Sequence, residues 1–262
     1  MSKTLPADLQ LALAMADVAD VITMQHYQSS TLRVESKPDL TPVTEADRAA
    51  EQSLRALLAE QRPLDDILGE EFGESAHTST RRWIIDPIDG TKNYVRGVPV
   101  WATLIALTID RIPVLGVVSA PALARRWWAA TGSGAWTSSL GKPAQPISVS
   151  AVANIADASF AYSDAIGWEE RGALGGLQHL NETTWRQRAY GDFWSHMLVA
   201  EGAVDISAEP DLGAWDMAAL IPIITEAGGK ATGFDGGPAL ESGCLVAANG
   251  LLHGMVLDRL KS

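Results

Sequence analysis

Residues 83–91, which read W-I-I-D-P-I-D-G-T, constrain the fold of this chain more than any other segment. The first three residues are strong β-formers, and Pro87 has no N–H to donate to a neighbouring strand. We therefore expect a buried strand that stops at Asp86, after which the chain turns outward. Gly90 permits a close approach of the backbone, and a helix that begins near Thr91 would offer its first free N–H groups to an anion.

Two carboxylates lie three residues apart at the expected end of this strand. Oxygen ligands are what magnesium prefers, and it is commonly bound by one or two carboxylates together with a substrate phosphate. One carboxylate can bridge two ions, and Asp86 is the candidate for this role, with Asp89 beside it. The carbonyl of Ile88 would add a neutral ligand. The alternative is that both aspartates only cap a turn.

Two further acidic clusters suit the same purpose. Glu70 follows an apolar pair and lies between glycines, so it would leave a short strand toward the same end of the sheet, unless it belongs to a solvated charge pair. Asp216 precedes an apolar run that ends in E-A-G-G, as the first residue of a helix closed by a glycine cap. Helix capping alone would explain Asp216. Pro222 within that run predicts a kink or a late helix start.

These motifs, G-E-E at 69–71, W-I-I-D-P-I-D-G-T at 83–91 and W-D followed by E-A-G-G at 215–229, resemble the inositol monophosphatase superfamily over almost the whole chain. The resemblance implies hydrolysis of phosphate monoesters with two or three Mg²⁺ ions per site, or with Mn²⁺. The metal ligands that it implies are Glu70, Asp86, the Ile88 carbonyl, Asp89 and Asp216. Its phosphate-binding residues are Gly90 and Thr91, and those that activate water are Glu70, Thr91 and Asp47.

Residues 37–47 resemble the mobile loop of the same family, which brings Lys37, and in some members an aspartate such as Asp39, near the metals. Thr44 and Asp47 also match a capping box at the start of a helix. The structural and the catalytic role of Asp47 can hold together.

Residues 186–194 stand where the family recognises the alcohol of its substrate. Members that prefer inositol tend to carry small or hydroxyl residues after the glycine of this segment, whereas this chain has Asp192, Phe193 and Trp194. Negative charge and aromatic surface disfavour inositol and suit a flat, cationic leaving group. The pattern G-D-x-W resembles the histidinol-phosphate phosphatases of the superfamily. Asp192 and Glu209 are the expected substrate contacts, although Glu209 could be a solvated loop charge and Trp194 a core residue.

The resemblance thus implies a histidinol-phosphate phosphatase, which converts L-histidinol phosphate and water to L-histidinol and phosphate in histidine biosynthesis. The alternatives are an inositol-1-monophosphatase or broad sugar monophosphatase, a nucleotide 3′-phosphatase, and a non-catalytic regulatory binder on the same fold. Retention of the acidic motifs disfavours the binder. Homodimers are common in this superfamily, so a homodimer is the expected assembly.

Composition excludes several other classes of protein. The chain has 262 residues, 47% of them hydrophobic, which is enough for one large core or two moderate ones. The net charge of −12 argues against nucleic acid and anionic membranes as partners and leaves a small phosphorylated metabolite. The apolar runs are shorter than the ~20 residues that span a bilayer. Because Cys244 is the single cysteine and no secretion signal is evident, we expect a cytoplasmic protein.

Hydrophobic periodicity predicts helices at about 5–28 and from about 44, followed by an antiparallel meander of strands at 101–110, 113–119, 125–130 and 133–137. A polar stretch at 138–143 divides the chain into an α+β half, 1–142, and an α/β half, 143–262. The resemblance implies an α+β fold with layers in the order α-β-α-β-α. An antiparallel sheet lies in the N-terminal half and a smaller mixed sheet in the C-terminal half.

Overall fold

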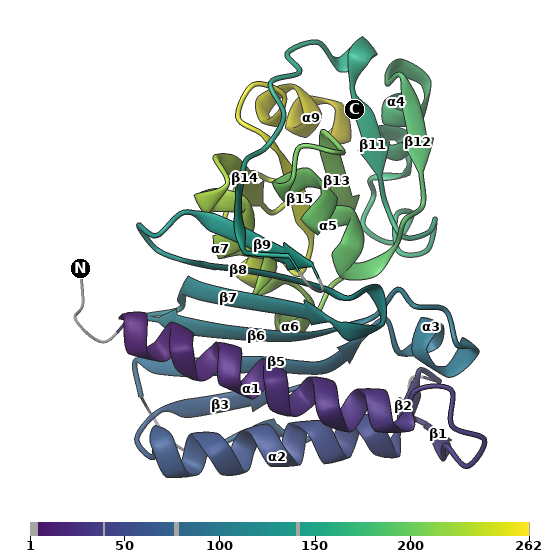
Figure 1. Ribbon diagram of the computed structural model, residues 1–262. Coiled ribbons are helices and arrows are strands. Elements are labelled where there is room, and N and C mark those ends of the chain that lie inside the picture. The colour runs from purple at the N-terminus through teal and green to yellow at the C-terminus, as the bar shows by residue number, and fades with distance from the viewer. Residues whose placement is uncertain (1–4, 39, 76–78, 140–141, 262) are drawn as a thin grey trace.

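The computed structural model describes residues 5–38, 40–75, 79–139 and 142–261 and stacks helices and sheets in five layers (Figure 1). The outermost layer consists of α1 (Leu5–His26) and α2 (Glu45–Gln61), which lie side by side across one face of the larger sheet. In α1 the buried apolar residues recur at the helical spacing that places them on one face: Ala12, Met15, Ala16 and Ala19. The two helices expected from the sequence are confirmed.

Within the described residues the larger sheet has eight strands in the order β10-β9-β8-β7-β6-β5-β3-β4. Their bounds are β3 (Asp66–Gly69), β4 (Gly73–Glu74), β5 (Arg81–Asp89), β6 (Ala102–Ile109), β7 (Ile112–Ala120), β8 (Arg125–Ala130), β9 (Ala135–Ser139) and β10 (Gln145–Ile147). Neighbouring strands are antiparallel except β3 and β5, which are parallel. The predicted meander is confirmed as β6 to β9. Strand β10 belongs to this sheet although it follows the predicted division of the chain after residue 142. The division into two halves stays a prediction.

The prediction that the strand beginning near Trp83 stops at Asp86 is wrong, because this strand, β5, continues to Asp89 through an irregularity in its pairing. Asp86 pairs with Leu104 and Asp89 with Ala102, so three steps along β5 match two steps along β6. One extra residue in a strand is a β-bulge, and Pro87 is tolerated there because a bulged residue makes no ladder hydrogen bond.

The bulge decides where the two carboxylates point. Successive side chains of a regular strand alternate between faces, so residues three apart would point in opposite directions. With one residue bulged out, Asp86 and Asp89 face the same side of the sheet, the side on which Leu104 and Ala102 join the central core. The chain then enters α3 (Thr91–Arg96) after Gly90, at φ +82°, so the predicted helix start near Thr91 is confirmed.

The second sheet is smaller and mixed, with the order β12-β11-β13-β15-β14 among the described residues. Its strands are β11 (Ser159–Ala161), β12 (Arg186–Arg188), β13 (Ile206–Glu209), β14 (Gly229–Thr232) and β15 (Leu245–Asn249). The layer between the two sheets holds α5 (Asp192–Ala200), α6 (Ala214–Met217) and α7 (Leu220–Glu226), and the far layer holds α4 (Leu174–Thr183) and α9 (His253–Leu260). Shorter elements are β1 (Val34–Ser36), β2 (Pro42–Thr44), α8 (Ala239–Ser242) and two 3-10 turns, η1 (Pro121–Leu123) and η2 (Ile155–Asp157).

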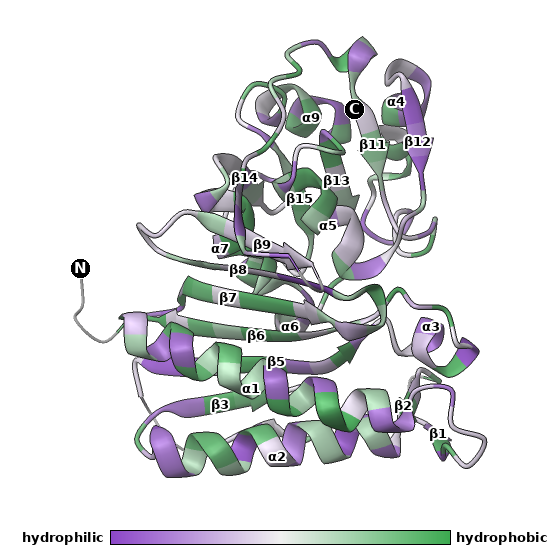
Figure 2. Ribbon diagram, in the orientation of Figure 1, coloured by the Kyte–Doolittle hydropathy of each residue, from purple (hydrophilic) through white to green (hydrophobic). Residues whose placement is uncertain are grey.

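Buried apolar side chains fill the spaces between these layers. One cluster joins α1 and α2 to the larger sheet, one joins α4 and α9 to the smaller sheet, and a central cluster joins both sheets through α5 and α7. Figure 2 shows the hydrophobic strands β6 and β7 at the centre and mixed polarity along α1 and α2. The expected α+β sandwich with α-β-α-β-α layers is confirmed. Among the described residues, no helix combines the length and the apolar character needed to cross a membrane.

Candidate active site

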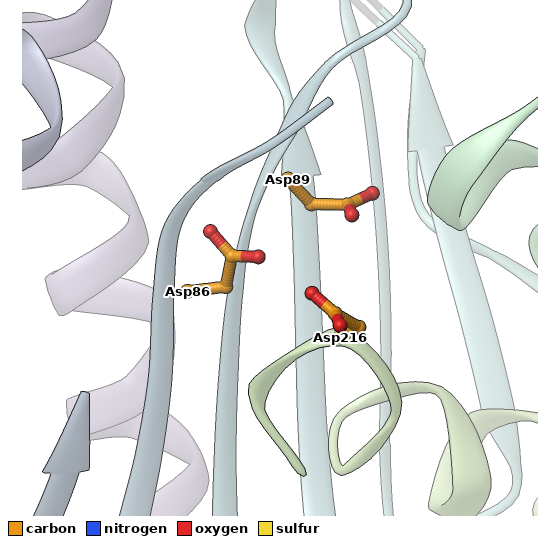
Figure 3. Close-up of side chains that lie close together, drawn as sticks. All are labelled: Asp86, Asp89 and Asp216. Carbon is orange, nitrogen blue, oxygen red and sulfur yellow. The ribbon is translucent and has the colours of Figure 1, made fainter. Parts of the chain in front are cut away.

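Three carboxylates converge where the larger sheet meets the middle layer of helices. Asp86 and Asp89 come from the bulged end of β5 and Asp216 comes from α6, and one oxygen of each lies within 4.8 Å of one oxygen of the others (Figure 3). Asp86 is 1% exposed and Asp89 is 9% exposed, while Asp216 is partly exposed. Three of the four acidic side chains expected as metal ligands are therefore brought together.

Asp216 is not the first residue of its helix, as the sequence suggested, but the third. Its carboxylate accepts a hydrogen bond from the N–H of Gly213, which precedes α6, at 2.6 Å. The helix is interrupted after α6 and restarts as α7 at Leu220. This agrees with the late start predicted from Pro222, which has no N–H for the carbonyl four residues earlier.

The electrostatics of the three carboxyl groups point to a cation. Burial raises the pKa of Asp86 and Asp89 well above the ordinary value, and the neighbouring carboxylates raise it further. Burial raises the pKa of Asp216 to about 7, and Asp216 shares a hydrogen bond with Asp86. Three such groups cannot all ionise side by side unless a positive charge lies among them. A donor set made only of oxygen fits a hard divalent ion such as Mg²⁺ or Mn²⁺.

Glu70 lies close to this cluster but its carboxylate is bound elsewhere. It follows β3, and its N–H donates to the carbonyl of Ile85 at 3.2 Å. The ammonium of Lys37 donates to Glu70 and lies 2.7 Å from both Glu70 and Glu71. Although burial opposes it, these two partners raise the pKa of Lys37. The charge of Glu70 raises the pKa of Asp86, so the two carboxylates lie near each other. The role of Glu70 as a metal ligand stays a prediction. Asp39 lies outside the described residues.

The turn after β5 is held by short contacts. The N–H of Ile88 donates to Asp86 at 2.9 Å, and the hydroxyl of Thr91 donates to the Ile88 carbonyl at 2.9 Å. A Cβ on Gly90 would lie 2.9 Å from the carbonyl of Val100, so this turn requires glycine both for its left-handed φ and for space. The Ile88 carbonyl faces Thr91 in this structure, and the predicted roles of both residues stay predictions.

Asp47 performs the capping role that its position suggested. One carboxylate oxygen accepts from the N–H of Thr44 at 2.7 Å and from its hydroxyl at 2.6 Å. The other oxygen, Oδ1, is buried and has no hydrogen-bond partner among the described residues. Burial raises the pKa of Asp47 to about 7 despite the bonds from Thr44. A buried carboxyl group with one free oxygen suits the predicted second role, which stays a prediction.

A cavity of about 160 Å³ adjoins two of the three carboxylates, Asp89 and Asp216, and is also lined by both expected substrate contacts. Its lining is Asp89, Ser163, Asp192, Phe193, His196, Glu209, Leu212, Asp216 and Leu220. Burial raises the pKa of Asp192 to about 6 and that of Glu209 to about 8. Glu209 is 6% exposed, so it is not a solvated loop charge. Trp194 does not line the cavity; it packs on the central core with its ring 5.8 Å from that of Tyr190.

A sequence model of the inositol monophosphatase family matches residues 4–262. The chain belongs to this family. It is 56% identical to the histidinol-phosphatase of Streptomyces coelicolor over 97% of this chain and 96% of the relative. It is 55% identical to the histidinol-phosphatase of Mycobacterium tuberculosis over 97% of this chain and 98% of the relative. Among solved structures, the extragenic suppressor protein suhB of Bartonella henselae covers 98% of the chain at 29% identity and a TM-score of 0.89.

The sequence analysis missed three polar residues at this site: Ser163 and His196 line the cavity, and Asn93 lies behind Asp192. Ser163 contacts both Asp192 and Glu209, and Asn93 contacts Asp192. His196 is 1% exposed, its Nδ1 lies 3.1 Å from the hydroxyl of Ser207, and burial lowers its pKa to about 3, so it is neutral. The G-T-x-N order at 90–93 could have drawn attention to Asn93. Ser163 and His196 carry no local signal.

Proposed function

We propose that this chain hydrolyses a phosphate monoester with a cationic leaving group, and that its substrate is L-histidinol phosphate, which water converts to L-histidinol and phosphate in histidine biosynthesis. The carrying observation is the cavity next to Asp89 and Asp216, where two acidic side chains from different elements, Asp192 and Glu209, lie together. The relatives named histidinol-phosphatase, at 55–56% identity over almost the full chain, support the same substrate.

The charge of the cavity selects the leaving group. Asp192 and Glu209 hold protons more tightly than ordinary carboxyl groups, because burial penalises the ionised form, and the charge of Lys92 offsets this only in part at Asp192. An ammonium group placed between them would stabilise both carboxylates. A neutral polyol such as inositol would bring no positive charge to these carboxylates, and ionisation in a buried site without a nearby positive charge costs free energy.

We propose magnesium as the cofactor, held by Asp86, Asp89 and Asp216, with Glu70 and the Ile88 carbonyl as the remaining protein ligands. Bound magnesium would supply positive charge to the phosphoryl oxygens and lower the pKa of a bound water. The oxygen-only donors and the raised pKa values of these carboxyl groups support the assignment.

The side chains around the metal site orient water and hold its proton. Because the Thr91 hydroxyl uses its hydrogen on the Ile88 carbonyl, its oxygen is left to accept a hydrogen bond from a water molecule. The free oxygen of Asp47 can take up a proton near neutral pH, since burial raises its pKa to about 7. Gly90 and Thr91 are the proposed phosphate contacts. Asp192 and Glu209 then fix the alcohol for departure.

A substrate panel with released phosphate as the readout tests this proposal. We expect kcat/KM for L-histidinol phosphate to exceed that for inositol 1-phosphate by at least ~100-fold, since a site with buried polar groups can reject by even larger factors a ligand that leaves them unpaired. Glu209→Gln should remove most of this preference, whereas Asp211→Asn, which changes an exposed acid two residues away, should keep it. A preference for inositol 1-phosphate or for a sugar phosphate would refute the proposed substrate.

Metal dependence is tested separately. Turnover should require Mg²⁺ or Mn²⁺ and should fall when Li⁺ competes. A chain that binds ligands without metal-dependent turnover would instead be a regulatory binder. We also propose a cytoplasmic homodimer, which light scattering of the purified protein would check for its stoichiometry and cell fractionation for its location.

A further inference from the structure

Asp192 holds a backbone conformation that few residues other than glycine adopt. Its φ is +48°, in the left-handed region, where a residue with a Cβ is strained. The N–H of Asp192 donates to the hydroxyl of Ser163 at 2.8 Å, which is one of the contacts that fix it. Strain of this kind persists only where the surroundings determine it, and it concentrates at ligand sites.

The carboxylate of Asp192 is fixed as well. The side-chain amide of Asn93 donates to Asp192 Oδ2 at 2.8 Å and to the carbonyl of Val100 at 2.9 Å. An amide NH2 group has two N–H donors, so both donors of this side chain are used. Asn93 lies in α3, two residues after Thr91, and Asp192 lies 99 residues further along the chain. The amide therefore links the turn that carries the proposed phosphate contacts to the leaving-group cavity.

Ser163 joins the two acidic side chains of the cavity. Because the N–H of Asp192 can only donate, the Ser163 oxygen accepts that bond, and its single hydrogen is free to go to Glu209 Oε1 at 2.7 Å. One hydroxyl thus links the main chain of Asp192 to the carboxylate of Glu209, to which the backbone of Ser163 is also hydrogen-bonded. Both bonds are short and lie in a partly buried place.

We propose that Asn93 and Ser163 are positioning residues for the leaving group, which set Asp192 and Glu209 at the spacing that a cationic alcohol requires. This inference rests on the proposed function and adds residues that would determine specificity without chemical contact with the phosphate. Rotation of either carboxylate after loss of its partner would misplace the substrate cation. Misplacement by about 1 Å can cost about 100-fold in rate.

The experiment compares two substrates that share a phosphate and differ in the leaving group. L-histidinol phosphate is cationic, and glycerol 2-phosphate has a neutral leaving group. We expect Asn93→Ala and Ser163→Ala to lower kcat/KM for L-histidinol phosphate by about 10- to 100-fold and that for glycerol 2-phosphate by less than about 3-fold. Calorimetry should show L-histidinol binding weakened by a similar factor, which is a readout independent of turnover.

Two further variants make the comparison specific. Ser163→Thr keeps the hydroxyl and should keep the substrate ratio of the natural chain. Asn154→Ala removes an exposed asparagine that accepts a bond from Ala156 N–H, and it should change neither substrate. A thermal melt of each variant identifies any that fails to fold, and the remaining positioning variant then carries the test.

The outcomes separate the inference from the function on which it rests. If the natural chain does not prefer L-histidinol phosphate, the proposed function is wrong and the inference falls with it. Suppose that the natural chain prefers L-histidinol phosphate. If a folded Asn93→Ala or Ser163→Ala variant then loses the same factor on both substrates, or keeps full activity on both, only the inference is overturned.

Discussion

Replacement of Asp216 by asparagine should make the metal-free protein more stable while it removes activity. Asp216 lies in a cluster of three carboxyl groups, and burial raises its pKa to about 7 from an ordinary value of 3.8. An acid whose pKa is raised by folding favours the folded state below the unfolded pKa, and this contribution is lost as the pH rises through the folded pKa. Asparagine cannot ionise, so Asp216→Asn avoids that loss.

The size of the effect follows from the pKa shift. Each unit corresponds to about 1.4 kcal/mol, so a shift of about three units gives a limit of about 4 kcal/mol. Asp216 is partly exposed, and solvent screening reduces the expected gain to about 2–3 kcal/mol. The gain should be small near pH 4, increase up to about pH 7 and stay constant above it.

Urea denaturation of the metal-free natural chain and of Asp216→Asn at several pH values measures this difference in the free energy of unfolding. Asp157→Asn, which changes an exposed aspartate in η2, is the matched control and should show no such trend. Magnesium should remove most of this difference, since an ion that binds only the folded state at 100 times its Kd adds about 2.7 kcal/mol to the natural chain. The asparagine variant should gain less than the natural chain.

Two results would refute this reasoning. If Asp216→Asn is less stable than the natural chain at pH 8 without metal, the carboxyl groups do not repel one another as the geometry indicates. If the difference is the same at pH 5 and pH 8, Asp216 keeps an ordinary pKa. Either result would remove the electrostatic argument for a cation at this place.

Three further predictions concern other parts of the site and the core. Gly69→Ala should destabilise the chain by about 1–3 kcal/mol in urea denaturation, because a Cβ there would lie 1.9 Å from buried Glu51 Oε1; an unchanged midpoint would contradict this. Trp83→Ala should cost about 3–5 kcal/mol, since Trp83 is 0% exposed, whereas Trp185→Ala, at a side chain 67% exposed, should stay within about 0.5 kcal/mol. Because burial raises the pKa of Glu209 to about 8, KM for the cationic substrate should fall as the pH rises toward 8, as the ionised form becomes available; the KM of Glu209→Gln, measured in the same buffers, should lack this trend.

The sequence predicted which carboxylates lie together in the candidate site better than it predicted how the backbone places them. Asp86 and Asp89 were identified from their spacing and from Pro87, but the backbone was expected to leave the strand at Asp86 and turn outward. The structure uses a bulge instead, because one extra residue in β5 brings two side chains of odd spacing to one face. Register between β5 and β6 is a tertiary property, and neither segment carries it alone.

The sequence analysis missed Asn93 and Ser163 for the same physical reason, which is that their partners lie far away in the sequence. Asn93 and Asp192 are 99 residues apart, and Ser163 and Glu209 are 46 apart, so no periodic pattern or local motif connects them. Local signals did succeed where partners are local. The capping box between Thr44 and Asp47 spans three residues, and it appeared as expected.

The position of the site between the layers explains how the fold tolerates it. Carboxyl groups that repel one another weaken the folded state, and they lie at the border of the central apolar cluster, in which Ile84 and Leu104 of the larger sheet meet Phe193 and Ile223 of the middle helices. Burial of these apolar side chains holds the two sheets together with or without a cation. Because the apolar core stabilises the fold and the carboxyl groups beside it carry the charge, Asp216→Asn should change the response of stability to metal and pH while the layers stay in place.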